Sequence, residues 1–80
     1  MSDHVIVYTT PTCGPCRRLK RTLDEAGVPF REVDINSDPE VARRIEAATG
    51  GYRIVPTVRV SGRLLVNPPA GDVVSLAAGN

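Results

Sequence analysis

The first part of the chain shows two hydrophobic periods, one typical of a strand and one typical of a helix. The nearly continuous apolar and β-branched run at residues 4–9 predicts a strand that is buried on both faces. From Gly14 to Ala26 the apolar residues recur at helical spacing, with Pro15 in the first turn and Gly27 suited to cap the end. The predicted apolar stripe of this helix consists of Cys16, Leu19, Leu23 and Ala26.

A second strand and a second helix are predicted next. Residues 28–35 have the composition of a strand, with Phe30 and Val33 as its buried anchors. The stretch Ser37-Asp38-Pro39-Glu40 predicts a helix start, because it combines a capping-box spacing with proline just inside the helix. Gly50-Gly51 ends this helix. Its predicted apolar stripe consists of Val41, Ile45 and Ala48.

The last part of the chain predicts a hairpin and a short helix. Thr57–Val60 and Arg63–Val66 read as two short strands around the turn at Ser61-Gly62. Residues 70–78 predict a final helix. The apolar residues of this helix are Val73, Leu76 and Ala77.

The predicted order of elements, β-α-β-α-β-β-α, places the chain in the α/β class. A strand–helix–strand unit forces the first two strands to be parallel through a right-handed crossover, whereas the later pair can join as a hairpin. We therefore expect a mixed four-stranded sheet flanked by helices. At 80 residues and 8.6 kDa the chain is expected to form one domain, residues 1–80, because it is too small to hold a second core.

Composition and charge exclude several classes of function. The formal charge of +1 argues against a surface dedicated to nucleic acid or to anionic membranes. No apolar run approaches membrane-spanning length, and residues 1–4 do not resemble the start of a signal or transit peptide. Two cysteines are too few for the disulfide framework of a small secreted scaffold. A reducing cytosol, and thus a cytoplasmic location, is expected.

The two cysteines stand in the stretch Cys13-Gly14-Pro15-Cys16, and this spacing allows them to close into a disulfide and reopen. Cys13 lies just ahead of a helix, where unpaired N–H groups and the helix dipole favour a thiolate, and nearby Arg17 and Lys20 add positive charge. A lowered pKa makes a thiol reactive at neutral pH. Cys16 lies one turn further, on the core-facing stripe. The pattern predicts that Cys13 attacks and Cys16 resolves.

Two other interpretations of the cysteine pair stay open. Free cysteines are among the most buried residue types, so the pair could simply fill the core. Cys-x-x-Cys is also half of a zinc ligand set, but the chain has no second cysteine pair and its one histidine, His4, belongs to a predicted strand. A closed zinc site within one chain would lack ligands, whereas an iron–sulfur cluster shared between two chains would not.

With Val55-Pro56-Thr57 as a second site, the chain resembles the glutaredoxin branch of the thioredoxin fold over nearly its whole length. The resemblance is carried by Cys13-x-x-Cys16 after the first strand, Val33-Asp34, and Val55-Pro56-Thr57-Val58 before Gly62. Residues 50–58 followed by Asn67-Pro68 are most similar to mycoredoxins, small redoxins that use mycothiol in place of glutathione. Arginine-rich composition fits the actinobacterial setting that this similarity implies.

The resemblance implies roles for individual residues. It implies that the Val55–Pro56 bond is cis and lies against the cysteine pair, and that the backbone of Val55 binds substrate as a short added strand. Cys13 is then the nucleophile and Cys16 the resolving thiol. Further binding residues implied near the groove are Tyr8, Thr10, Arg53 and Asp72. The alternative for these four is packing for Tyr8 and a solvated surface for the others.

Two positions depart from the glutaredoxin pattern. Glutaredoxins usually carry Gly-Gly after the last strand, where backbone N–H groups take a glutathione carboxylate, but here Asn67-Pro68 stands there and Pro68 has no N–H. Gly14-Pro15 is the thioredoxin pair, whereas glutaredoxins more often have an aromatic second residue. Because thioredoxin has a potential of about −270 mV and glutaredoxins about −200 to −230 mV, we predict a potential below about −230 mV.

The sequence therefore predicts an enzyme, a glutaredoxin- or mycoredoxin-like thiol–disulfide oxidoreductase. We expect it to reduce mixed disulfides between proteins and a low-molecular-weight thiol, with mycothiol favoured over glutathione as co-substrate and with no bound cofactor or metal. The expected partners of this monomer are disulfide-containing or thiol-modified proteins, the small thiol and a flavoprotein disulfide reductase. One alternative is a dithiol electron donor to ribonucleotide reductase, recharged by a flavin-dependent thioredoxin reductase. Another is a metal or iron–sulfur cluster carrier.

Overall fold

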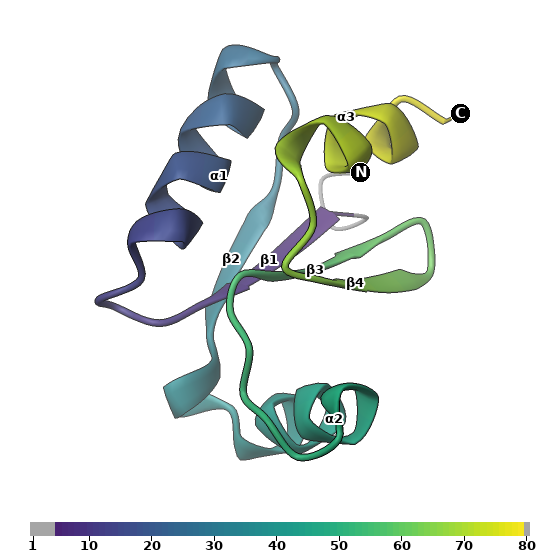
Figure 1. Cartoon of the computed structure of the whole chain (residues 1–80). Helices are drawn as coiled ribbons and strands as arrows, with labels where there is room; N and C mark the ends of the chain where they lie inside the picture. Colours follow the sequence, from purple (N-terminus) through teal and green to yellow (C-terminus); the bar gives the residue numbers. More distant parts are fainter. Residues whose placement is uncertain (1–4, 80) are drawn as a thin grey trace.

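The computed structural model of the chain describes residues 5–79 and has the predicted order of elements (Figure 1). Its strands are β1 (Val5–Thr9), β2 (Arg31–Asp34), β3 (Thr57–Val60) and β4 (Arg63–Val66). Its helices are α1 (Gly14–Glu25), α2 (Pro39–Thr49) and α3 (Ala70–Ala77), together with a short 3₁₀ helix, η2 (Ile35–Ser37). His4, predicted in the first strand, lies outside the described residues.

The strands form one mixed sheet in the order β2-β1-β3-β4. The first two strands, β1 and β2, pair in parallel, and the other two pairings are antiparallel, which confirms both predictions about strand direction. The hairpin has the predicted bounds because Ser61 and Gly62 both have positive φ, 51° and 76°, as a tight two-residue hairpin turn requires. This arrangement places β1 in the interior of the sheet, so the segment that follows it starts from a fixed position.

Helices cover both faces of the sheet (Figure 1). On one face α1 and α3 pack on a cluster of buried residues, and on the other face α2 and η2 complete a smaller cluster. The larger cluster consists of Val5, Val7, Leu19, Leu23, Val58, Val60 and Val73. The smaller cluster consists of Tyr8, Ile35, Ala42 and Ile45. Alternate residues of β1 therefore point into different clusters, as the pleat of a strand requires.

Helix α1 carries the cysteine motif on a stripe that faces the core. Cys16, Leu19 and Leu23 are buried, as predicted. The prediction was wrong for Ala26, which is exposed because the helix ends at Glu25 and residue 26 already leaves the periodic stripe. The chain then turns through Gly27, whose φ of 73° lies in the left-handed region that glycine adopts without strain.

Strand β2 is shorter than the predicted strand at residues 28–35. Asp34 ends it, because its Oδ1 accepts a 2.9 Å hydrogen bond from the N–H of Asn36 and so begins η2. The buried anchor of this region is Ile35, whereas Phe30 and Val33 are only half-buried. The prediction of a second strand in this region, parallel to the first, was therefore confirmed, but its predicted bounds were wrong.

Helix α2 begins and ends where the sequence predicts. The side chain of Asp38, not that of Ser37, caps the helix by accepting a 3.2 Å hydrogen bond from the N–H of Val41. Gly50 ends it with a φ of 80°. Ala42 is buried in place of the predicted Ala48, which is exposed. Within residues 5–79, no helix combines the length and the hydrophobicity needed to cross a membrane.

Candidate active site

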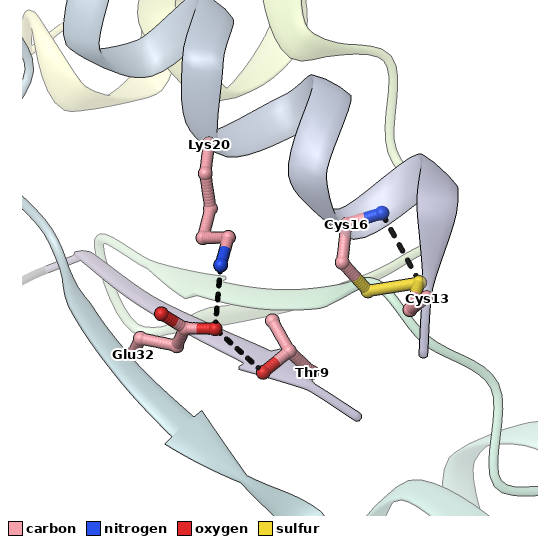
Figure 2. Close-up of polar contacts among 5 residues, drawn as sticks. All are labelled: Thr9, Cys13, Cys16, Lys20 and Glu32. Carbon is pink, nitrogen blue, oxygen red and sulfur yellow. Dashed lines mark hydrogen bonds and ion pairs between the residues drawn. A yellow bond between two sulfur atoms is a disulfide. The ribbon is translucent and has the colours of Figure 1, made fainter. Parts of the chain in front are cut away.

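Cys13 lies in the turn between β1 and α1 and is the N-cap residue of the helix. Its own N–H donates a 3.3 Å hydrogen bond to the carbonyl of Thr10, which fixes the turn. Its Sγ accepts a 3.1 Å hydrogen bond from the backbone N–H of Cys16. The two sulfur atoms are joined in a disulfide (Figure 2). The structure therefore shows the oxidised form of the pair, with a helix amide aimed at the outer sulfur.

The two cysteines differ strongly in access to solvent. Cys16 is 1% exposed on the core-facing stripe of α1, whereas Cys13 is half-buried at the end of the helix. The first turn of α1 contains no acidic residue. Because unpaired N–H groups at a helix start stabilise negative charge, the local field favours a thiolate at Cys13 once the disulfide opens. The arrangement can support attack by one sulfur and resolution by the other.

Lys20 does not direct its charge at Cys13, because it is engaged on the sheet side of the helix. Its Nζ lies 2.8 Å from Oε2 of Glu32, and Oγ1 of Thr9 donates a 2.9 Å hydrogen bond to the same oxygen (Figure 2). The hydrogen bond from Lys20 lowers the pKa of Glu32, against an opposing effect of desolvation. This cluster connects α1 to β1 and β2 just below the motif.

Val55 and Pro56 form the segment that leads into β3. The peptide bond between them is cis, as the family resemblance implied. Val55 is half-buried and packs against the smaller core cluster. Within residues 5–79, neither its backbone N–H nor its C=O has a hydrogen-bonding partner. Both groups are therefore available to an extended segment of another molecule.

Pro56 is buried and lines a hollow beside the motif, which we call the Pro56 hollow. The hollow lies between the start of α1 and the segment that joins β4 to α3. It is lined by Pro15, Arg18, Leu19, Thr22, Pro56, Asn67, Pro68 and Ala70. Asn67 has a positive φ of 49° and its N–H donates a 2.8 Å hydrogen bond to the carbonyl of Pro56. Pro15 of the motif, the cis-proline Pro56 and the residues Asn67 and Pro68, which depart from the glutaredoxin pattern, thus share one concave surface.

Comparison with known proteins identifies the family. Residues 5–65 match the family model named Glutaredoxin. The chain belongs to the glutaredoxin family. This glutaredoxin-family chain is 41% identical over 68 residues to a Mycobacterium tuberculosis protein predicted to be a glutaredoxin, with 84% of the chain and 81% of the relative covered. It is 37% identical over 74 residues to mycoredoxin 1 of Corynebacterium glutamicum, with 91% of each covered.

The fold has solved counterparts. The structure of the glutaredoxin-like NrdH-redoxin from Escherichia coli superposes with a TM-score of 0.76 at 24% identity, covering 90% of the chain and 92% of that protein. A thioredoxin-like protein of 28% identity superposes with a TM-score of 0.73, covering 90% and 97%. The predicted thioredoxin-like fold is confirmed, and the chain is a glutaredoxin-like thiol–disulfide oxidoreductase.

The four further binding residues that the resemblance implied are scattered in this glutaredoxin. Thr10 lies at the turn before Cys13. Tyr8 is buried on the face of the sheet that α2 covers. Arg53 pairs with Glu46 of α2, with 2.7 Å between Nε and Oε2. Asp72 stands in the first turn of α3 and is not one of the residues that line the Pro56 hollow. Their roles in binding stay predictions.

Arg18 and Glu32 are the positions near the motif that the sequence analysis did not single out. Arg18 lies one helical turn after Gly14, a spacing that could have drawn attention to it. No pattern in the sequence pointed to Glu32, because its partners Thr9 and Lys20 come from two other elements.

Within the part of the chain that the structure describes, no group of three or more His, Cys, Asp or Glu side chains is placed to hold a metal ion.

Proposed function

We propose that this protein reduces mixed disulfides between protein cysteines and a low-molecular-weight thiol, with mycothiol favoured over glutathione, and that Cys13 is its nucleophile. The observation that carries the proposal is the pairing of a half-buried Cys13 at a helix start with a fully buried Cys16 whose N–H donates to the Cys13 sulfur. A sulfur in that position is stabilised as a thiolate and can be reached by substrate. We also propose that residues 1–80 form one monomeric domain that acts in the cytoplasm.

The proposed reaction is two successive thiol–disulfide exchanges. The Cys13 thiolate attacks the small-thiol sulfur of the mixed disulfide, and the protein thiolate leaves and takes a proton from solvent. The new disulfide joins Cys13 to the small thiol. A second molecule of the small thiol, as thiolate, then attacks the bound small-thiol sulfur, which releases the symmetric small-thiol disulfide and restores the Cys13 thiolate. No electrons are gained or lost overall, because one disulfide replaces another.

A second route uses Cys16. Its thiolate attacks Sγ of Cys13 and releases the small thiol, which leaves the intramolecular disulfide. Reopening that disulfide needs two electrons, which a flavoprotein disulfide reductase or two further thiols would supply. Both routes need the substrate held beside Cys13, and we propose that the unpaired backbone groups of Val55 hold it as an added strand next to Pro56.

The preference for mycothiol is supported by the backbone at Asn67 and Pro68. The Asn67 N–H is already bonded to the Pro56 carbonyl, and Pro68 has no N–H. The two amides that would take a glutathione carboxylate are thus unavailable at this place. The 37% identity to a mycoredoxin over 91% of the chain supports the same choice.

A second candidate function is a dithiol electron donor to ribonucleotide reductase, recharged by a flavin-dependent thioredoxin reductase. The observation that favours it is the thioredoxin dipeptide Gly14-Pro15 between the cysteines. The two candidates differ in the number of sulfur atoms that they need. A mixed disulfide can be reduced with Cys13 alone, whereas a protein disulfide needs both Cys13 and Cys16.

The experiment that tests the proposal compares Cys13→Ser and Cys16→Ser with the wild type. The substrate is a mycothiol mixed disulfide of a cysteine peptide, and the reductant is mycothiol, glutathione or a flavoprotein thioredoxin reductase with NADPH. We expect turnover with mycothiol in the wild type and in Cys16→Ser, and none in Cys13→Ser. Loss of turnover in Cys16→Ser, with efficient recharging of the wild type by the flavoprotein, would instead support the electron-donor function.

A further inference from the structure

We propose that Arg18 binds a carboxylate of the protein substrate, so that the enzyme prefers cysteines that have an acidic residue beside them. The inference rests on the proposed function and names the substrate class of that same site. It depends on where the guanidinium lies, on what shares the Pro56 hollow with it, and on which charges near it are unpaired.

The guanidinium of Arg18 is folded back toward the cysteine motif. Side chains on a helix lean toward its N-terminus, and Arg18 stands one turn after Gly14. Its Nη1 lies 3.8 Å from the point that a Cβ of residue 14 would occupy. The charged group therefore lies next to Gly14, in the backbone between Cys13 and Cys16.

The same side chain lines the Pro56 hollow, and among residues 5–79 it is the one charged residue of the lining. Pro15 and Pro56 bring the motif and the substrate-binding segment to this surface, and Asn67 and Pro68 form its far side. A substrate segment that enters this hollow beside Pro56 would therefore meet the guanidinium. The hydroxyl of Thr22, which also lines the hollow, already donates a 3.1 Å hydrogen bond to the backbone carbonyl of Arg18.

Arg18 has no carboxylate partner among residues 5–79, whose ion pairs engage Lys20, Arg44 and Arg53 instead. A guanidinium presents parallel N–H groups that match a carboxylate, and such charge-assisted pairs are stronger than neutral hydrogen bonds. Arg17 and Arg21 are exposed on the same helix and are also unpaired among the described residues. An acidic side chain is thus attracted to this helix and finds a matched partner at Arg18.

The test uses three peptides that differ only in the residue next to the cysteine, which is Asp, Asn or Lys. Each peptide carries the same uncharged cap, 2-mercaptoethanol in a mixed disulfide. For the wild type we expect kcat/KM for the Asp peptide to exceed that for the Lys peptide by about tenfold at low salt. Raising the salt to about 1 M should reduce this ratio, because exposed charges are then screened.

The matched variants are Arg18→Gln, Arg18→Lys and Arg21→Gln. We expect Arg18→Gln to bring the Asp/Lys ratio to within about twofold of unity, and Arg18→Lys to restore part of it. Arg21→Gln removes the same charge one turn further along, outside the hollow, and should keep most of the preference. The ratio is insensitive to any loss of activity that affects all peptides equally.

Three results would overturn the inference: no preference in the wild type, a ratio unchanged in Arg18→Gln, or equal losses in Arg18→Gln and Arg21→Gln. Failure of the proposed function looks different, because the wild type would then also fail to reduce the mycothiol mixed disulfide of the cysteine peptide that tests that function. A last arm replaces the uncharged cap with glutathione on the Asn peptide. If Arg18→Gln slows only this substrate, the carboxylate belongs to the small thiol and the inference about protein substrates is wrong.

Discussion

The N–H of Asn67 donates a 2.8 Å hydrogen bond to the carbonyl of Pro56, which extends the pairing of β3 and β4 by one step toward the motif. The residue that follows, Pro68, has no N–H at all. One side of the Pro56 hollow therefore offers no backbone amide to an incoming carboxylate. This relationship between two neighbouring segments bears directly on which small thiol can be used.

Pro68→Gly should increase the use of glutathione. The substitution returns one N–H to the hollow, and a hydrogen bond to a charged group contributes about 1.5 kcal/mol or more, which corresponds to about tenfold in kcat/KM. The measurement is the ratio of glutathione- to mycothiol-dependent turnover. Pro69→Gly, which restores an N–H outside the hollow, is the control. An equal change in both variants would point to backbone flexibility rather than to recognition.

The redox potential should lie below about −230 mV, on the thioredoxin side of the glutaredoxin range. Pro15→Tyr, which gives the motif an aromatic second residue, should raise the potential by about 30 mV or more. Equilibration with a redox buffer of known composition, followed by alkylation of free thiols, measures both values. A wild-type potential clearly above −230 mV would show that the dipeptide does not set the potential here.

The sequence predicted the order and type of the elements well, because the local signals agreed with one another. The hairpin is the clearest case: Ser61-Gly62 can adopt the positive φ values that the turn needs, and both strands have the predicted bounds. Cys16 also faces the core as its helical spacing indicated. The ends of elements were less predictable, since Asp34 closes β2 through its own side chain.

The site was predicted only where it is local in sequence. Cys13 and Cys16 belong to one turn, so spacing alone placed them. The contact between Lys20 and Glu32 depends on how α1 lies on the sheet and on the register of β1 against β2, which fix the partner of each side chain. Arg18 and Pro56 line the same hollow although they lie far apart in the sequence. Pairwise relationships of this kind are tertiary and leave no trace in the periodicity of the chain.

Glu32→Gln should change how stability depends on pH. The folded pKa of Glu32 is lowered below its ordinary value of 4.5, mainly by the hydrogen bond from Lys20, so the ionised carboxylate stabilises the fold. That stabilisation is present above pH 4.5 and is lost as the pH falls through the lowered folded pKa. The variant should therefore show a shallower loss of stability on acidification below pH 4.5, measured by urea unfolding at several pH values.

The size of this effect should be modest. The side chain of Glu32 is 42% exposed, so solvent screens the pair and we expect less than about 1 kcal/mol near neutral pH. Glu40→Gln is the matched control, because it breaks a more exposed pair within α2, with 3.5 Å between Glu40 and Arg44. The prediction is contradicted if both variants have the same acid profile.

Leu23→Ala should destabilise the fold strongly. Leu23 is 0% exposed in the larger core cluster, and truncating a buried leucine costs about 2–5 kcal/mol. For a domain of this size that loss corresponds to a fall in Tm of roughly 10 °C or more. Leu64→Ala, at a side chain that is 38% exposed, should cost far less. Calorimetry of both variants checks the contrast. A similar fall in Tm for the two variants would show that Leu23 does not contribute to the core as its burial indicates.

The position of Cys13 at the start of α1 also determines how an inactive enzyme should be made. Its sulfur is the group that caps the helix, so replacing it with alanine would remove chemistry and cap together. Serine is one of the preferred N-cap residues, and its hydroxyl can accept the same amide hydrogen from Cys16. Catalytic loss and structural damage can therefore be separated at this one position, because Cys13→Ser removes the sulfur and keeps a cap, and a comparison of Cys13→Ser with Cys13→Ala measures what a side-chain cap contributes to the stability of the helix start.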